Sequence, residues 1–235
     1  MARRIILFLI LSVATVSFVY GQKNTRNYII YPDICLENWK AAYGLTFMTT
    51  PSSVTEEFHR RIPAGEFCAV KQLSGNFYLN PKLRFQFLQN ELILNVGYLL
   101  SNNNSWAVAT EIGSSVWAGI LKTEAYDRKG YGFMCYPAIK AGYKLKQDLL
   151  LTLKVEAIFN LKRYDIAGKI SRSLHAPFYS GQAVSFFIEQ PFFKSTNVIL
   201  GFRAMYCDFY WQTWTLNESF EDHIFYPEIL IELIL

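Results

Sequence analysis

The chain has 235 residues, a net charge of +4, 17% aromatic residues and four cysteines. This composition excludes a disordered chain, a collagen and a disulfide-dense mini-protein. The positive charge is too small and too dispersed to predict nucleic-acid binding, so we expect no nucleic-acid partner.

Residues 1–21 are predicted to be a secretory signal peptide. Arg3 and Arg4 form a basic start, an apolar run follows from Ile5 to Val16, and Gly21 suits the end of a cleavage site. The run is too short for a membrane-spanning helix, which needs about 20 apolar residues. Residues 22–37 are then expected to form a short periplasmic segment.

The mature chain has no stretch that approaches 18 consecutive apolar residues. Its only route into a membrane is therefore a closed β-barrel, in which strands satisfy all of each other's backbone N–H and C=O groups. Strands that alternate apolar and polar residues over about ten positions are typical of such barrels.

Alternation of this kind recurs along the chain, and we predict about ten strands, with eight or twelve as alternatives. In chain order the predicted strands are 38–49, 79–89, 91–100, 106–112, 115–125, 131–145, 149–161, 184–188, 198–210 and 225–235. The stretch 51–75 contains prolines and charges and alternates poorly, so it is expected to be a long external loop, with short strand character at 67–70. A tight turn is expected at Gly113 and Ser114.

The connections between these strands differ in length. Short turns at Gln89, Gly113, Lys146 and Pro191 fall on one side when strands are counted backward from a periplasmic C-terminus. The longer connections, 50–78, 126–130, 162–179 and 213–223, fall on the other side, together with a short turn at Asn102. Short periplasmic turns and long external loops are the asymmetry expected of an outer-membrane barrel.

With its signal peptide, the alternating strand 149–161 and the terminal strand 225–235, the chain resembles the small outer-membrane β-barrel proteins of Gram-negative bacteria. The resemblance implies an all-β, closed, antiparallel up-and-down transmembrane barrel over residues 38–235. It also implies location in the cell outer membrane, contact with outer-membrane lipid and, as a further partner, another outer-membrane protein.

In proteins of this class the last strand is usually the signal for the barrel-assembly machinery, and it commonly ends in an aromatic residue; Leu235 departs from that. The predicted assembly signal is the apolar face of this strand, Phe225, Ile229, Ile231, Leu233 and Leu235. The strand 38–49 is expected to close the barrel against it.

The opposite faces of the strands predict a charged lumen. Its members are Lys40, Arg84, Lys140, Lys154, Glu156, Glu189, Arg203, Glu228 and Glu232. A barrel of about ten strands is narrow and largely filled by side chains. Because an unpaired buried ion is costly, we expect these charges to pair into a plug, with Glu228 and Glu232 as partners of Lys40 or Arg203.

We therefore predict a non-enzymatic structural or accessory subunit without cofactor or metal, with a plugged lumen and partner-binding external loops. Three alternatives remain open. In the first, the lumen is a small passive channel for polar solutes. In the second, the chain is a lipid-modifying enzyme that uses His59, His175 or His223 with a nearby serine or acid. In the third, the two faces of the strands are inverted and the chain is a soluble lipocalin-like carrier.

The cysteines, Cys35, Cys68, Cys135 and Cys207, show no metal-ligand spacing and are expected to be unpaired.

Overall fold

The computed structural model describes residues 39–49, 61–86, 89–103, 105–122, 127–146, 149–167, 170–174, 177–193, 196–208 and 223–234. The predicted signal peptide and periplasmic segment lie outside the described residues, as do Cys35, His59, His175 and Leu235. Within the described ranges, no helix is long and apolar enough to cross a membrane.

The described residues form eleven β-strands. They are β1 (Lys40–Thr49), β2 (Arg61–Ser74), β3 (Phe77–Phe85), β4 (Gln89–Asn102), β5 (Trp106–Lys122), β6 (Asp127–Lys146), β7 (Leu149–Ala167), β8 (Ile170–Leu174), β9 (Tyr179–Phe193), β10 (Thr196–Cys207) and β11 (Ile224–Ile234). Every pair of neighbouring strands is antiparallel.

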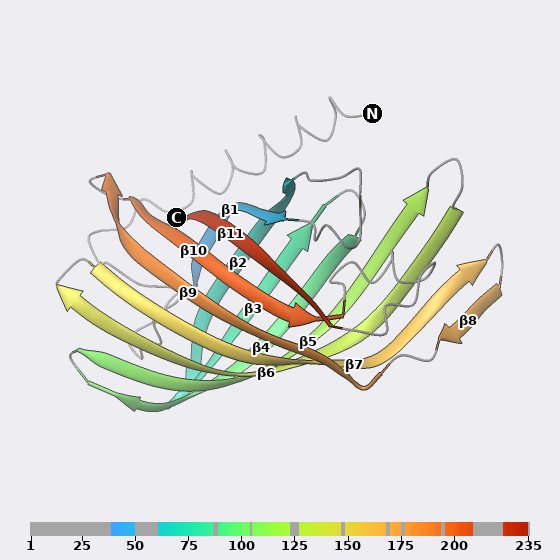
Figure 1. Cartoon of the computed structure of the whole chain (residues 1–235). Coiled ribbons are helices and arrows are strands. Elements are labelled where there is room, and N and C mark those ends of the chain that lie inside the picture. The colour runs from blue at the N-terminus through green and yellow to red at the C-terminus, as the bar shows by residue number, and fades with distance from the viewer. Residues whose placement is uncertain are drawn as a thin grey trace.

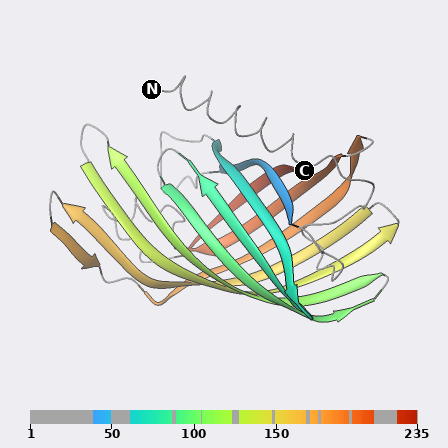
Figure 2. The ribbon, with the colours of Figure 1, turned by 180° about the vertical axis from the view of Figure 1, so that it is seen from behind.

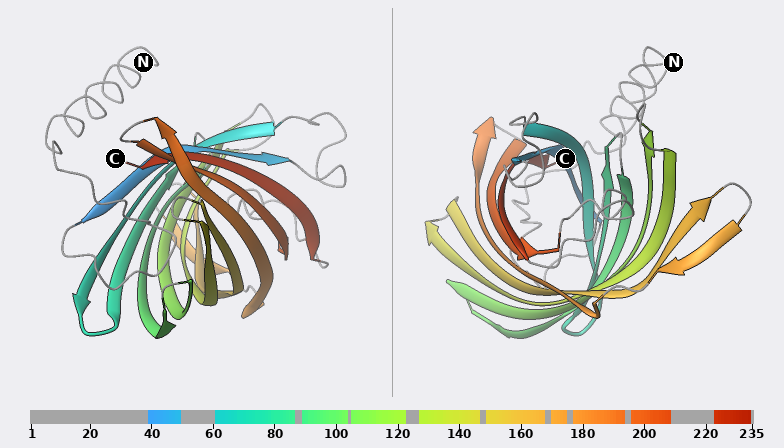
Figure 3. Two further views of the ribbon diagram at one scale, coloured as in Figure 1. Left: turned by 90° about the vertical axis from the view of Figure 1, so that its left-hand side faces the viewer. Right: turned by 45° about the vertical axis from the view of Figure 1, so that its right-hand side comes forward.

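Ten of these strands close into a barrel (Figure 1). Each strand from β1 to β7 pairs with the next, β7 also pairs with β9, and β9, β10 and β11 lead back to β1. The closing seam joins Leu45 to Ile231 and Phe47 to Ile229, so the predicted closure of the first strand against the last is confirmed. The strands wrap around one interior when the barrel is seen from behind and from the side (Figures 2 and 3).

The two ends of the barrel differ. We call the end where β1 begins and β11 finishes the terminal end, and the opposite end the loop end. At the loop end β5, β6 and β7 continue past their neighbours, and β8 pairs with β7 alone (Figure 1). We call this extension, residues 120–122, 127–130, 160–167 and 170–174, the wing.

The strands place apolar side chains outward and polar or small side chains inward. On β4, Leu92, Leu94 and Val96 are exposed, whereas Glu91 and Asn95 on the opposite face are buried. An apolar exterior with a polar interior is the arrangement of a transmembrane barrel. The soluble-carrier alternative requires the reverse, with the charges facing water, and the structure contradicts it.

Aromatic residues gather on the exterior near both ends of the barrel. Toward the terminal end, Phe77 and Tyr98 make an edge-on ring contact at 4.9 Å between centroids. Toward the loop end, Phe159 contacts Phe178 at 5.0 Å and Tyr179 at 5.8 Å. Aromatic girdles at both lipid–water boundaries are typical of membrane barrels.

The predicted external loop 51–75 is wrong over residues 61–74, which form the barrel strand β2, whereas the strand character expected at 67–70 is confirmed. Residues 51–60 lie outside the described residues. The inward face of β2 carries Ala64, Glu66, Cys68 and Val70, all buried, and these small or polar residues hide the usual apolar alternation. Pro63 lies near the start of the strand, where a missing backbone donor is tolerated best.

The predicted turn at Gly113 and Ser114 is also wrong, because β5 runs without interruption from Trp106 to Lys122. Gly113 points inward, where a β-carbon would overlap with the side chain of Asn95. The glycine therefore relieves crowding in the lumen and does not mark a turn.

These two errors offset each other in the strand count, but the spurious turn misplaces two connections. Counting β5 as two strands assigns the Gln89 and Asn102 turns to the wrong ends. In the structure β4 begins at the loop end and finishes at the terminal end. The predicted loop 162–179 also holds the end of β7 and all of β8.

The packing at the closing seam indicates that the barrel requires a glycine at position 44. A side chain at Gly44 would overlap with the carbonyl oxygen of Ile231 across the β1–β11 pairing. We expect Gly44→Val to prevent closure and to lose at least about 3 kcal/mol of stability, since overpacking against backbone cannot relax easily. Leu45→Val, outward on the same seam, is the control.

Heat-modifiable gel migration measures closure, because a folded barrel changes mobility on boiling. The Gly44→Val protein should migrate as unfolded without boiling, and the Leu45→Val protein should shift like the wild type. Normal migration of both proteins would contradict the assigned seam.

Candidate functional site

The barrel interior is organised in three layers: an apolar cluster toward each end and a layer of charges between them. The terminal-end cluster comprises Ala42, Cys68, Val70, Tyr78, Leu99, Ala107, Ala109, Leu150, Ile199, Leu230 and Ile234, with Phe187 packed against it. The loop-end cluster comprises Met48, Trp117, Met134, Tyr136, Ile158, Ala183, Met205, Cys207 and Tyr226.

The layering follows from the two-residue period of the strands. On β11, Tyr226, Glu228 and Leu230 all point inward and lie in the loop-end, charged and terminal-end layers respectively. On β10, Ile199, Arg203 and Met205 repeat the same order in the opposite direction.

The charged layer is a connected network of ion pairs, which we call the lumen network. At one side, Glu66 of β2 accepts contacts from Lys82 at 2.7 Å and from Arg84 Nε at 3.4 Å. Arg84 Nη2 then donates to Glu228 of β11 at 2.7 Å. Glu228 is held in turn by Arg203 of β10, whose Nη1 lies at 3.7 Å.

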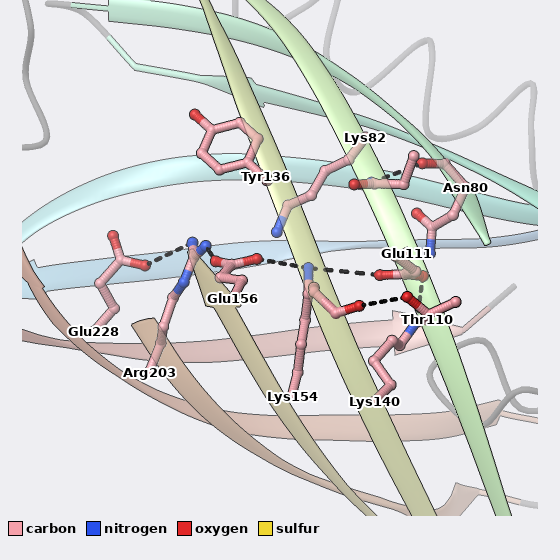
Figure 4. A network of polar contacts seen from close by, with 12 residues as sticks. Asn80, Lys82, Thr110, Glu111, Tyr136, Lys140, Lys154, Glu156, Arg203 and Glu228 are labelled. Atoms are coloured by element: carbon pink, nitrogen blue, oxygen red, sulfur yellow. Dashed lines mark hydrogen bonds and ion pairs between the residues drawn. The ribbon is translucent and has the colours of Figure 1, made fainter. Parts of the chain in front are cut away.

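The network continues across the lumen to the opposite wall (Figure 4). Arg203 also contacts Glu156 of β7, which pairs with Lys154 Nζ at 2.7 Å. Lys154 lies 3.6 Å from Glu111 of β5, and Lys140 of β6 lies 2.8 Å from the other oxygen of the same carboxylate.

Two tyrosines add hydrogen bonds to these carboxylates. Tyr78 Oη donates to Glu111 at 2.9 Å, and the amine of Lys140 lies 5.5 Å from the centre of the Tyr78 ring. Tyr136 Oη donates to Glu91 at 2.5 Å. Charged groups in a low-dielectric interior are stable only when such partners satisfy them.

The space left around the network is small. A cavity of about 40 Å³ lies on its loop-end side and another of about 50 Å³ on its terminal-end side. Both cavities are lined by Glu66, Lys82, Lys154, Glu156 and Arg203, so the network is the wall between them. A water molecule needs roughly 10–15 Å³ of such space, which leaves room for a few waters on each side.

The structure brings together six of the nine residues predicted for the lumen. Arg84, Lys140, Lys154, Glu156, Arg203 and Glu228 belong to the lumen network. The expected pairing of Glu228 with Arg203 is present.

The other three predicted lumen residues lie nearer the terminal end. Glu189 is buried and accepts a hydrogen bond from Asn197 at 3.4 Å. Glu232 is buried, and Cys68 Sγ lies 3.9 Å from it. Lys40 is half-buried at the start of β1.

Sequence reasoning missed Glu66, Lys82 and Glu111 as members of the network. Glu66 was hidden by the loop assigned to 51–75, and Glu111 by the false turn at Gly113. Continuous alternation from Ala107 to Ser115, with every second residue small or polar, is the sequence signal that would have found Glu111.

The predicted assembly signal lies on the outer face of β11. Phe225, Ile229 and Ile231 are exposed and Leu233 is half-buried. Their recognition by the assembly machinery stays a prediction.

Other reactive groups lie outside the lumen network. His223 Nδ1 lies 3.3 Å from Asp208, and its ring contacts Tyr179 and Tyr206 at the loop end. The described cysteines, Cys68, Cys135 and Cys207, are free. Across the described ranges, no cluster of three or more histidine, cysteine or acidic residues is arranged to hold a metal ion.

No protein-family model and no curated protein sequence matches the chain. Among solved structures it is similar to an outer membrane channel from Pseudomonas putida F1, at 7% identity and a TM-score of 0.49, covering 91% of this chain and 100% of that chain. The NanC porin is similar at 8% identity and a TM-score of 0.41, covering 83% and 98%.

Ail, the attachment invasion locus protein of Yersinia pestis, is similar at 10% identity and a TM-score of 0.38, covering 83% and 96%. These likenesses concern the β-barrel fold alone. The closed ten-stranded barrel of this chain is established by its own strand pairing.

The two inward glutamates of β11 provide a direct test of the lumen network. Glu228→Leu removes a carboxylate shared by Arg84 and Arg203. We expect the free energy of unfolding to fall by about 3 kcal/mol, which is the low end of the range for breaking a buried ion pair. The loss is at the low end because each arginine keeps a second carboxylate. Glu232→Leu, equally buried but outside the network, should cost about 1 kcal/mol or less.

Denaturant unfolding in detergent micelles measures both variants, and the double variant should unfold like Glu228→Leu. Equal losses for the two single variants would show that the network does not hold the barrel together.

Proposed function

We propose that this chain is a β-barrel of the Gram-negative outer membrane with a closed lumen, acting as a non-enzymatic structural or accessory subunit. The observation that supports a closed lumen most directly is the lumen network, which crosses from Glu66 on β2 to Lys140 on β6 through Arg203 on β10. Side chains from opposite walls therefore meet in the middle of the barrel.

The apolar layers support the same proposal. Leu150 and Ile199 are fully buried on the terminal-end side, and Trp117, Met205 and Tyr226 are as deeply buried on the loop-end side. A hydrated solute would have to disrupt two packed apolar clusters as well as the ion pairs. Both steps are costly, so passive conduction is the less favoured alternative.

A barrel with a filled interior must act through its exterior or its ends. The wing gives the loop end a four-stranded sheet beyond the ring, and the exposed aromatic residues Phe178 and Tyr179 contact Phe159 of β7 where the wing begins. Aromatic residues are enriched at protein interfaces, which supports the loop end as the place where a partner binds.

Conductance tests the closed lumen. Wild-type protein inserted into planar bilayers should give no stable current steps, because the lumen network and the apolar layers close the path. Co-flotation with lipid vesicles and heat-modifiable migration confirm insertion in the same preparation. Reproducible unitary steps from inserted protein would favour the channel instead.

Cell fractionation tests the location. The protein should sediment with the outer membrane and resist extraction by salt, since its apolar outer face requires lipid. It should also change gel mobility on boiling. Recovery in the soluble periplasm without detergent would overturn the membrane assignment.

A further inference from the structure

The outer face of the wing and of the strands just below it carries a basic patch around two stacked tyrosines. Tyr131 of β6 and Tyr164 of β7 stack with ring centroids 4.7 Å apart and planes 12° apart. Lys122, Lys129 and Lys162 surround them, and all three lysines are exposed. We call these five residues the outer basic patch.

The strand pairing places these residues side by side on one face. Tyr131 is opposite Tyr164, Lys129 is opposite Ile120 and Ile166, and Lys162 is opposite Phe133. Lys162 directs its amine over the Tyr164 ring, 5.3 Å from its centre, and so toward the loop end. Among the described residues on this face of the wing, Asp127 is the one acidic residue. It is exposed at the start of β6, opposite Lys122.

The patch is continuous with the lipid-facing surface of the barrel. Phe133, Val116 and Ile120 are exposed on the same strands and the same face, directly next to the patch. A ligand of the patch therefore has an apolar surface immediately beneath it. This continuity favours a lipid, whose acyl chains cover the apolar belt while its headgroup reaches the lysines.

The spacing of the lysines indicates the kind of headgroup. Lys129 and the register position of Lys162 are four residues apart along β6, about 13 Å at about 3.3 Å per residue. Two phosphates carried at the two ends of a sugar unit match this separation, so each can contact one lysine. Tyrosine hydroxyls at a lipid–water boundary can donate hydrogen bonds to the sugar between them.

We propose that the outer basic patch binds the headgroup of a phosphorylated glycolipid in the surrounding membrane. The lysine amines make charge-assisted hydrogen bonds to the phosphates, and the stacked tyrosines contact the sugar. The proposal rests on the membrane placement of the barrel and does not depend on a closed lumen.

The test uses the full-length protein reconstituted in phosphatidylcholine vesicles that contain a small fraction of bisphosphorylated lipid A. After mild detergent extraction, mass spectrometry measures the lipid A retained per protein. Lys129→Gln/Lys162→Gln should retain at least about tenfold less than the wild type, because each lysine near an anionic lipid surface contributes substantially to binding. Heat-modifiable migration shows that the variant is inserted and folded.

A matched control lies at the other end of the barrel. Lys71 also lies over an aromatic ring, 5.7 Å from the centre of Trp39, so Lys71→Gln removes a similar pair from the terminal end. This variant should retain lipid A like the wild type. Equal losses in both variants would reduce the patch to general interfacial charge and overturn the proposal.

Experiments with other lipids and with phosphate show which part of lipid A the outer basic patch binds. Dephosphorylated lipid A should be retained at least about tenfold less than bisphosphorylated lipid A, because it has no phosphates for the lysine amines. Inorganic phosphate should displace little of the bound lipid, because it lacks the acyl chains that contact the apolar belt. Equal retention of dephosphorylated lipid A, or stronger retention of phosphatidylglycerol, would overturn the glycolipid assignment. Failure to insert into vesicles would instead contradict the membrane placement, independently of the patch.

Discussion

The pairing of charges in the middle of a narrow, low-dielectric lumen constrains the rest of this structure. Removing an ion from water costs several kcal/mol even after the protein relaxes, so each charge of the lumen network depends on an oppositely charged partner. The pairing of β6 with β7 shows the constraint most clearly. Lys140 and Lys154 are direct register partners and would repel one another, but Glu111 of β5 contacts both.

The same constraint specifies the register of the barrel. Arg203 and Glu228 are direct partners across β10 and β11, and Glu66 and Arg84 are direct partners across β2 and β3. A slip of one residue in any of these pairings would turn the charge toward lipid and an apolar residue toward the network. The ion pairs therefore select one closed arrangement among those that backbone hydrogen bonding alone would allow.

The sequence predicts the outward face of this barrel better than the inward face. Lipid requires apolar side chains at every second position, so strands such as β4 and β7 are recognisable from their leucines and valines. The lumen accepts small, polar, charged or apolar residues, depending on the layer. Glu66 beside Cys68 and Ala64 therefore has no periodic signature strong enough to predict β2.

The sequence predicts which residues face the lumen better than it predicts which of them pair with one another. Glu228 and Glu232 are both inward on the same strand, yet only Glu228 lies level with the arginines of β3 and β10. That level depends on the stagger between neighbouring strands, which the closed barrel determines and local sequence does not. Gly113 shows the related error, since a glycine that makes room for Asn95 resembles a glycine that forms a turn.

The network and the wing divide the molecule into a part that holds the barrel and a part that is available for binding. In the lumen, each member of the network is engaged by another, and the flanking apolar layers lower the local dielectric, which strengthens the ion pairs. At the wing, Lys122, Lys129 and Lys162 are exposed, and no packing requirement of the barrel explains three lysines around the Tyr131–Tyr164 stack. Lumen charges that already neutralise one another leave little to attract a ligand, whereas exposed lysines above an apolar belt do so at little cost to stability. Recognition by this barrel is therefore expected on its outer surface near the loop end.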